Sequence, residues 1–308
     1  MTILVCGEAL YDVFVGEETA GGFALDARIG GSAFNVAIGL ARLDMPVGLL
    51  TGMSTDALGD KLVRALEGEG VATRFLTRPD APTTLALVAL DAAGAAHYQF
   101  YGEGAADRQV TAADLPAIEG LDALVFGCFS MMTRPTGDSF LTLARRAAGG
   151  PLVVLDPNVR PTVEPDMGLW RNRVEAFAEH ADLIKASSDD MAALYTEPVA
   201  DVAAHWLGLG VRMVVITEGG RGARAFLPSG AFEVAAEAVD LVDTVGAGDS
   251  FLAALLTALS DDGRINRTAL GAISAEAAGR AMAFASRAAA ITCSRRGADL
   301  PRRADLGV

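Results

Sequence analysis

The sequence predicts an α/β fold, built as a doubly wound, mostly parallel sheet that is flanked by helices. Three observations point to this class. Short strands that are apolar along their whole length alternate with helical stretches, as expected of a sheet covered on both faces. Polar or glycine residues follow directly after several of these strands. One region breaks the alternation with strands that no helix separates, which predicts a small additional β-sheet.

The alternation begins at the N-terminus. Residues 2–6 form an apolar run that we expect to be a buried first strand. A glycine-rich segment without regular structure is expected next, ending at residues 28–31. A helical pattern then runs from Ser32, its expected N-cap, to about residue 43. The next strand and the next helix are expected over residues 47–51 and 57–67.

The region from about residue 73 to 110 is the one that breaks the pattern. Its two β-rich runs, residues 85–90 and 97–101, flank the turn residues 91–94 and predict an antiparallel hairpin outside the main sheet. Two uses stay open: a flap that closes over a site, or an edge extension used for dimerisation. We expect lid segments at approximately residues 12–30 and 73–110 of a single domain that spans residues 1–308.

The second half returns to alternating strands and helices. Strands of the main sheet are expected at residues 123–127, 152–156, 182–186 and 213–217. Two hairpin-like strands near residues 223–226 and 232–234 come next, followed by a short strand at 238–242. Apolar residues then recur at helical spacing from Phe251 to Leu259, and a long alanine-rich helix is expected from about residue 269 to 290.

Composition limits the possible partners. The 308 residues are 51% hydrophobic, enough to bury a large core. The net charge of −14 argues against nucleic acid or an anionic membrane surface as a partner. No apolar run approaches the length of a membrane span, and we expect a cytoplasmic protein. The three cysteines lie far apart in apolar surroundings and are expected to be reduced core residues.

Several common active-site motifs are absent from the sequence. Its two lysines, Lys61 and Lys185, do not follow a glycine, so no Walker-type phosphate loop is possible. The three histidines lack the spacing of a zinc protease. No Gly-x-Gly-x-x-Gly follows the first strand, which makes a dehydrogenase a poor interpretation.

The stretch from Asp243 to Asp249 carries the strongest chemical signal. Gly246 and Gly248 have no Cβ, so an anion could approach the backbone at the start of the helix that follows. The first N–H groups of a helix lack intrahelical partners and lie at the positive end of its dipole, which suits an anion. Asp249 is then either a residue that pairs with the helix dipole or a base beside a phosphate site.

The positions of other polar residues favour the base. In open α/β sheets, ligands bind outside the carboxyl ends of the strands. The residues that follow predicted strand ends are Asp12, Asp156 to Asn158, Lys185 to Ser187, Thr217 to Gly219, and the Asp243 turn.

Two of these segments resemble signatures of a known family. Gly30–Leu43, with paired glycines and Asn35, resembles the N-terminal signature of the ribokinase-like (phosphofructokinase-B) carbohydrate kinases, and Asp243–Phe251 resembles the C-terminal one. The chain looks most like the bacterial fructokinases within that family. Weaker similarities follow in family order at residues 7–12, 100–108, 156–160 and 289–295.

The resemblance implies a ribokinase-like fold with a β-sheet lid, and a role for individual residues. Asp249 matches the family's catalytic base, and Gly246, Ala247 and Gly248 match its anion hole. Residues that match or adjoin sugar-binding positions are Asp12, Gly30, Gly31, Asn35, Phe100, Arg108, Asn158 and Arg160. Residues expected on the nucleotide side are Lys185, Ser187, Thr217, Gly219, Gly222 and Ser286. A water-mediated Mg²⁺ contact is expected at Asp190, and backbone K⁺ ligands are expected at Asp243, Val245, Thr292 and Gly297.

Some of these residues have other interpretations. The Gly30–Gly31 pair could be a tight turn before a helix, and Phe100 could pack the flap. Arg160 could pair with Glu164 or Asp166 on the surface. Many relatives have Asn-x-x-Glu where this chain has Ser187 to Asp190, which leaves the residue that organises magnesium open.

These observations lead to a ranked set of functions. The first is an ATP-dependent sugar kinase that transfers the γ-phosphate to a primary hydroxyl, most simply O6 of D-fructose. The alternatives within the family are a 2-keto-3-deoxygluconate kinase, a ribokinase or a nucleoside kinase. The alternative outside catalysis is a sugar sensor on the same fold. The expected partners are a sugar, ATP and Mg²⁺, with K⁺ and a homodimer through the lid as further possibilities.

Overall fold

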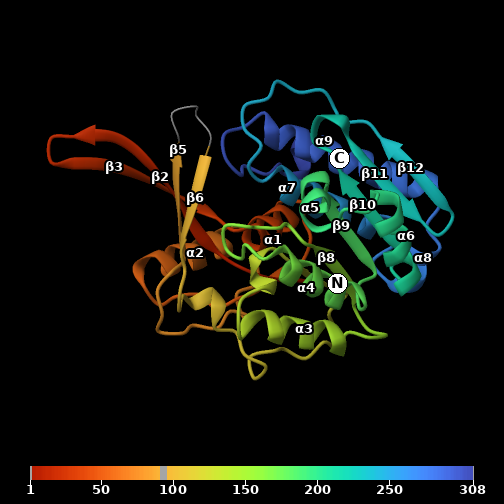
Figure 1. Cartoon of the computed structure of the whole chain (residues 1–308), viewed down its shortest axis with the longest axis horizontal. Coiled ribbons are helices and arrows are strands. Elements are labelled where there is room, and N and C mark those ends of the chain that lie inside the picture. Colours follow the sequence, from red (N-terminus) through yellow and green to blue (C-terminus); the bar gives the residue numbers. More distant parts are fainter. Residues whose placement is uncertain (1, 91–95, 308) are drawn as a thin grey trace.

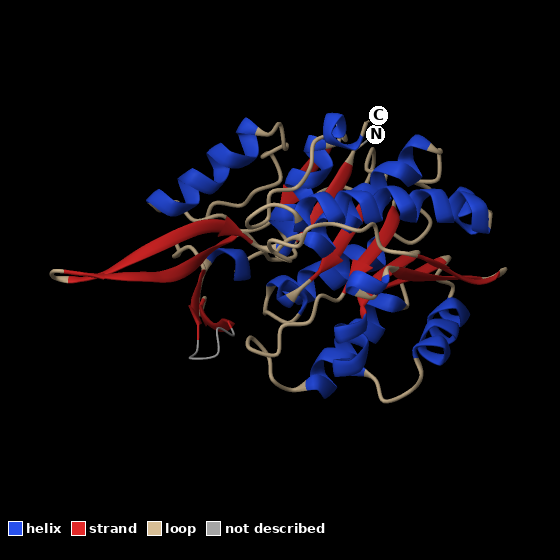
Figure 2. Cartoon of the chain, turned by 90° about the horizontal axis from the view of Figure 1, so that it is seen from above, coloured by secondary structure: helices blue, strands red, loops and turns tan. Residues whose placement is uncertain are grey.

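The computed structural model describes residues 2–90 and 96–307. It contains an eight-stranded central sheet and a separate four-stranded sheet that extends from one side of the body (Figure 1, Figure 2). The central sheet has the order β12 (Gly230–Val234), β11 (Ala223–Leu227), β10 (Met213–Thr217), β9 (Leu183–Ser187), β8 (Leu152–Asp156), β7 (Ala123–Gly127), β1 (Ile3–Cys6) and β4 (Val47–Leu50).

This central sheet is the predicted doubly wound one. Strands β4, β1 and β7 to β10 are parallel, whereas β11 and β12 are antiparallel additions at one edge. Side chains alternate between the two faces, so Ile3 and Val5 enter one hydrophobic core and Leu4 and Cys6 enter the other. Helices cover both faces, as predicted for strands that are apolar throughout.

Each face has its own set of helices. One core includes side chains of α1 (Ser32–Arg42), α2 (Ala57–Gly68), α7 (Ala247–Asp261), α8 (Arg267–Gly271) and α9 (Ala275–Cys293). The other core includes side chains of α3 (Thr136–Arg146), α4 (Met167–Ala178), α5 (Ser188–Leu194) and α6 (Val199–Leu209). None of the helices in the described part of the chain is both long and apolar enough to cross a membrane.

The smaller sheet is built from strands of the two segments predicted to form a lid. Its order is β3 (Gly22–Gly30), β2 (Leu10–Thr19), β5 (Leu85–Leu90) and β6 (Ala96–Tyr101), with β2 parallel to β5 and the other pairs antiparallel. The predicted β5–β6 hairpin is confirmed, although its turn residues 91–94 lie outside the described part. The β2–β3 hairpin projects away from the body as an arm (Figure 1).

Three predicted elements were wrong. The glycine-rich stretch before residue 28 is not irregular, because β2 and β3 satisfy each other's backbone groups across a long ladder. Residues 238–242 form no strand, and Val239, Leu241 and Val242 lie exposed. The long helix expected from residue 269 is two helices, since Ser274 accepts a hydrogen bond from the Ala277 N–H at 3.1 Å and caps a new start.

Replacing a packed helical glycine by alanine should destabilise the protein, whereas the same change at an open helical glycine should not. A Cβ on Gly39 of α1 would lie 2.9 Å from the Ala253 Cβ of α7 and 2.5 Å from a Leu300 methyl, whereas a Cβ on Gly68 of α2 would meet nothing within 4 Å. Gly39→Ala should therefore lower the free energy of unfolding by about 1 to 3 kcal/mol through overpacking. Gly68→Ala should leave it unchanged or raise it by up to about 1 kcal/mol. Urea denaturation of both variants measures this, and equal effects would contradict the packing.

Candidate active site

The start of α7 is open in the way that an anion site requires. Gly246 is the N-cap, with a φ of 79°, and it provides no side-chain hydrogen bond. A Cβ there would lie 2.8 Å from the Ala298 Cβ, so the turn has room only for glycine. Ala247 and Gly248 then begin the helix at the positive end of its dipole. The Ala247 N–H donates to the Thr244 carbonyl at 3.2 Å, so the Gly248 N–H is the more open of the two.

Asp249 lies in the first turn of α7 and faces α1. Its side chain is buried, and the residue is only 7% exposed. Its Oδ1 accepts a hydrogen bond from the Ser32 hydroxyl at 2.6 Å, and its Oδ2 accepts one from the Asn35 amide at 2.9 Å. Ser32 in turn accepts a hydrogen bond from the Asn158 amide at 2.8 Å. A carboxylate can accept about four hydrogen bonds, so half of this capacity remains for a ligand. This geometry favours the base over a dipole-pairing residue.

Asp12 completes the acidic part of the site from the lid strand β2. Burial raises the pKa of Asp12 to about 6, with Arg160 lowering it and Asp249 raising it, so the three groups share one electrostatic environment. A Cβ on Gly30 would come within 2.3 Å of the Asp12 Oδ2. Gly31 has a φ of 103°, and a Cβ there would lie 2.8 Å from the Glu8 carbonyl. Both glycines therefore permit close approaches that build the site.

Lys185 brings a positive charge to the start of α7. Its Nζ lies 2.8 Å from the Asp156 Oδ2, and both side chains are 4% exposed. A Cβ on Gly248 would lie 3.0 Å from the same Nζ, which places the ammonium group beside the glycine turn. Burial alone would lower the pKa of Lys185, but Asp156 raises it above its usual value. Burial raises the pKa of Asp156 to about 6, which leaves the pair ionised at neutral pH.

Asp190 is occupied by structural hydrogen bonds. Its Oδ2 accepts from the Ser187 backbone at 2.9 Å and from the Ser187 hydroxyl at 2.7 Å, forming a capping box at the start of α5. Its Oδ1 accepts from the Val159 N–H at 2.7 Å, which ties α5 to the loop that holds Asn158. The carboxylate thus orders the site, and any contact with a metal would use its one remaining lone pair.

The carboxylates suit a metal ion that arrives with phosphate. Among the described residues, no three His, Cys, Asp or Glu side chains lie close enough together to hold an ion on their own. The Asp156 Oδ1 is nevertheless buried without a hydrogen-bond partner. Mg²⁺ is commonly held by one or two carboxylates together with water and substrate phosphates. The oxygen donors present therefore fit Mg²⁺ bound jointly with a nucleotide.

The four predicted K⁺ positions come together beside the glycine turn. The Asp243 Oδ2 accepts a hydrogen bond from the Gly297 N–H at 2.8 Å, and the Asp243 Oδ1 accepts one from the Val245 N–H at 3.1 Å. Thr292 is fully buried, and its hydroxyl donates to Ser250 of α7 at 2.9 Å. Residues 243–245 thus adjoin the C-terminal end of α9 and the turn that follows it, as shared backbone ligation would require.

Three further residues were predicted on the acceptor side: Arg160, Phe100 and Arg108. The Arg160 guanidinium donates to the carbonyls of Asn158 at 3.2 Å and Val159 at 3.0 Å, so its described hydrogen bonds do not go to Glu164 or Asp166. The Phe100 ring packs edge-on against the Phe129 ring at 5.5 Å, and the Arg108 guanidinium lies 5.6 Å from that same ring. Phe100 thus packs the base of the lid, the alternative that the sequence left open.

The remaining predicted residues are more scattered. Thr217 pairs with Ser187 across β10 and β9, at the same edge of the sheet as Lys185. Gly219 and Gly222 have φ values of 58° and 101° in the turn into β11. Ser286 lies on the buried side of α9, which packs against α7. No hydrogen bond among the described residues joins Ser286 to Asp249.

Sequence reasoning missed two residues of the site. Ser32 was expected to cap α1, but the N-cap is Gly31 and the Ser32 hydroxyl is directed at Asp249. Glu8 had no expected role, yet it is fully buried and accepts a hydrogen bond from the Ser32 N–H at 2.8 Å. A serine before a helical pattern looks the same in sequence whether it caps its own helix or bonds to another helix. Only the fold shows where its hydroxyl points.

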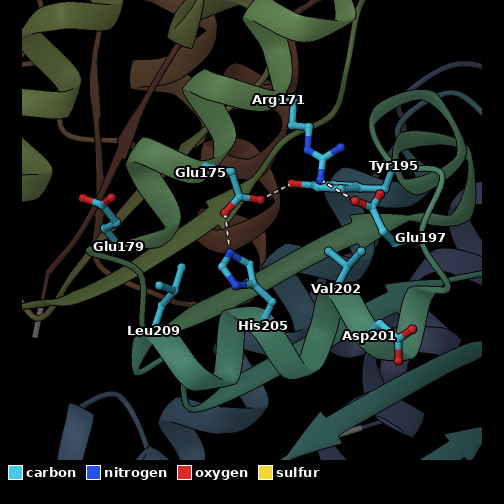
Figure 3. A pocket seen from close by; sticks show the side chains of 9 residues that line it. All are labelled: Arg171, Glu175, Glu179, Tyr195, Glu197, Asp201, Val202, His205 and Leu209. Atoms are coloured by element: carbon cyan, nitrogen blue, oxygen red, sulfur yellow. Dashed lines mark hydrogen bonds and ion pairs between the residues drawn. The ribbon is translucent and has the colours of Figure 1, made fainter.

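A hollow of about 520 Å³ lies between α4 and α6, and none of the predicted site residues lines it (Figure 3). Five of its polar side chains pair with one another. Glu175 accepts a hydrogen bond from the Tyr195 hydroxyl at 2.6 Å and lies 3.0 Å from the His205 ring nitrogen, while Arg171 pairs with Glu197 at 2.7 Å. These contacts make it a surface hollow between α4 and α6, apart from the residues around Asp249.

Residues 2–305 match the family described as pfkB family carbohydrate kinase. The chain belongs to this family. It is therefore a phosphotransferase that acts on a sugar hydroxyl, with the ribokinase-like fold predicted from its sequence.

Relatives and solved structures agree with the family. A fructokinase of Rhizobium leguminosarum bv. trifolii is 36% identical over 277 residues, covering 89% of this chain and 85% of the relative. The crystal structure of a fructokinase with bound ATP from Xylella fastidiosa has a TM-score of 0.92 and 26% identity, covering 99% of this chain and 96% of that one. An aminoimidazole riboside kinase from Salmonella enterica, solved with aminoimidazole riboside and an ATP analogue, has a TM-score of 0.85 and 25% identity, covering 100% and 98%.

The raised pKa of Asp12 predicts a pH-dependent stability. An aspartate in the unfolded chain ionises near pH 4, whereas Asp12 in the folded protein ionises near pH 6. Its contribution is thus fully present below pH 4 and is lost as the pH rises through 6. Relative to the wild type, Asp12→Asn should gain on the order of 2 kcal/mol in free energy of unfolding between pH 4 and pH 7.

Denaturant titrations at several pH values measure this gain, with Asp240→Asn on an exposed stretch as the control. If both variants follow the wild-type pH dependence, burial does not raise the pKa of Asp12, and this prediction is contradicted.

Proposed function

We propose that this enzyme is an ATP-dependent fructokinase that converts D-fructose to fructose 6-phosphate. The observation that carries the proposal is Asp249, a buried carboxylate with free acceptor capacity beside a glycine-lined helix start. The fructokinase relatives support the choice of sugar, and the ATP-bound neighbour supports the phosphoryl donor.

The acceptor sugar would bind between the lid and the carboxyl ends of the strands. Asp12 and Asn35 suit sugar hydroxyls, because a carboxylate accepts hydrogen bonds and an amide both accepts and donates them. The same Asn35 amide already donates to Asp249. A hydroxyl held by Asn35 is therefore held within reach of Asp249.

The transfer itself needs one base and a positively polarised pocket. Asp249 takes the proton of the sugar's primary hydroxyl as its oxygen attacks the γ-phosphorus, and the bond to the β–γ bridging oxygen breaks to release ADP. The N–H groups at the start of α7 and the Lys185 ammonium group stabilise the charge on the transferred phosphoryl group. Mg²⁺, held by the phosphates with Asp156 or with Asp190 through water, would neutralise further phosphate charge.

The nucleotide side and the monovalent ion complete the proposal. ATP would lie at the carboxyl ends of β9 and β10, with its terminal phosphate at the glycine turn. This region contains Ser187 and Thr217 at the strand ends and Gly219 and Gly222 in the turn after β10. K⁺ bound by carbonyls of residues 243–245, of the end of α9 and of the turn after it would raise the positive potential beside the glycine turn.

We propose that residues 1–308 form one domain. A cytoplasmic location stays a prediction, and the free cysteines Cys6, Cys128 and Cys293 fit a reducing compartment.

A riboside acceptor is the second candidate. An aminoimidazole riboside kinase of Salmonella typhimurium is 31% identical over 242 residues, and the related solved enzyme carries its riboside. Asp12 and Asn35 would serve a ribose as well as a fructose.

Removing the base provides the decisive test. Asp249→Ala should reduce kcat by a factor of about 10² to 10⁴, as expected for loss of a general base, while sugar binding measured by calorimetry stays nearly unchanged. A coupled assay for ADP formation with fructose, ribose and aminoimidazole riboside would identify the acceptor, and NMR would locate the phosphorylated hydroxyl. Asp240→Ala, on an exposed stretch, is the control.

Wild-type turnover in Asp249→Ala would remove this residue from the mechanism. Sugar binding without ADP formation in the wild-type protein would favour a sensor over a kinase.

We also propose that the lid arm pairs two copies of the chain. Val15, Phe23 and Leu25 are 45%, 59% and 55% exposed and lie near one another on paired strands, with Val15 opposite Leu25. Closer to the body, Tyr11 and Val13 have the same orientation on β2 and are buried in the core. The apolar face thus continues beyond the body without cover in the chain itself, and a second copy supplies an equal face.

Phe23→Ser combined with Leu25→Ser should then convert a dimer to a monomer in light scattering coupled to size-exclusion chromatography. Ala24→Ser is the matched control, because this residue is exposed on the opposite face of β3. A monomeric wild-type protein at micromolar concentration, or a double variant that stays dimeric, would contradict the proposal.

A further inference from the structure

The hydroxyl of Ser32 occupies an unusual position for the first residue of a helix. A serine at a helix start commonly satisfies the backbone of its own helix. Here Gly31 is the N-cap and no side-chain cap is formed by it. The Ser32 hydroxyl donates instead to the Asp249 Oδ1 at 2.6 Å, across the gap between α1 and α7.

Asn158 fixes the direction of this hydrogen bond. Its amide nitrogen donates to the Ser32 Oγ at 2.8 Å. Because an amide nitrogen can only donate, Ser32 accepts at this contact and its own proton must go elsewhere. The Asp249 carboxylate is the acceptor in reach, and a hydroxyl bonded to an ionised carboxylate forms one of the stronger hydrogen bonds in proteins.

Glu8 performs the capping that Ser32 does not. Its Oε1 accepts a hydrogen bond from the Ser32 N–H at 2.8 Å, and its carbonyl accepts one from the Phe34 N–H at 3.2 Å. Its Oε2 accepts a hydrogen bond from the Ser130 hydroxyl. Glu8 is fully buried, so these contacts hold the start of α1 against the connection between β1 and β2. A carboxylate is also favoured by the dipole at a helix N-terminus.

Hydrogen bonds thus connect Glu8 to Ser32 and Ser32 to Asp249. The inference drawn from them rests on the proposed role of Asp249 as the base. We propose that Ser32 is a positioning residue for Asp249, and that Glu8 holds Ser32 in place by capping α1 from outside the helix. Ser32 stabilises the ionised carboxylate and, together with Asn35 on the other oxygen, fixes its rotation. The lone pairs left free are then directed at the acceptor hydroxyl before the sugar binds.

The Ser32→Ala variant tests this directly. It should reduce kcat about ten- to a hundred-fold, because an unsupported carboxylate can turn away from the acceptor, and it should leave KM for Mg-ATP unchanged. A hydrogen bond to the ionised form lowers the pKa of a carboxylate. Loss of that bond should therefore shift the acid limb of the kcat–pH profile to higher pH, which a structural role alone would not do. Ser32→Thr keeps the hydroxyl and should restore most of kcat.

A double-mutant cycle separates positioning from general damage. In the Asp249→Ala background there is no carboxylate to hold, so adding Ser32→Ala should cost less than two-fold further in kcat. Glu8→Ala should lower the melting temperature and kcat together. Glu8→Gln, which keeps an acceptor for the Ser32 N–H, should lose less than Glu8→Ala in both measurements.

Three results would overturn the proposal. These are a Ser32→Ala variant with wild-type kcat and pH profile, a full ten-fold or larger further loss when Ser32→Ala is added to Asp249→Ala, and a Ser32→Thr variant that folds but is no better than Ser32→Ala. The proposed function fails separately, through an Asp249→Ala variant that retains turnover.

Discussion

The contact between Asp249 on α7 and the start of α1 is the interaction on which the site depends. Its two hydrogen bonds, from Ser32 and from Asn35, join residues separated by more than 200 positions in the chain. They connect the helix whose N-terminus suits phosphate with the helix whose first turn suits a sugar. Phosphoryl transfer is catalysed mainly by positioning and by electrostatic stabilisation, so a rigid junction between donor and acceptor sides is what the chemistry requires.

The site contains buried carboxylates whose ionised forms are unfavourable in the folded protein. Burial raises the pKa values of Asp12 and Asp156 to about 6, so both are ionised at neutral pH at a cost in stability. Lys185 offsets this cost at Asp156 by direct pairing. In the described part of the chain no ion pair joins Asp12 to a cation, and Arg160 lowers its pKa through its charge. Carboxylates whose pKa values are raised in this way are typical of a functional site.

The sequence predicted the central sheet and the glycine turn well because both depend on local patterns. Apolar strands and the Gly246–Asp249 stretch can be recognised from a few residues each. The β2–β3 arm was missed because its strands are stabilised by each other and not by a buried apolar pattern. Ser32 and Glu8 were missed for a related reason. Their roles come from tertiary contacts, across 217 and 24 residues of sequence, that no local spacing encodes.

The central claim is that Asp249 is held ready to receive a proton from the acceptor. A crystal structure with fructose and a non-hydrolysable ATP analogue tests it most directly. We expect one Asp249 oxygen within about 3.2 Å of the fructose O6, with Ser32 still bonded to the carboxylate and the γ-phosphate at the start of α7. A complex in which O6 lies away from Asp249, with the γ-phosphate bound elsewhere, would contradict it.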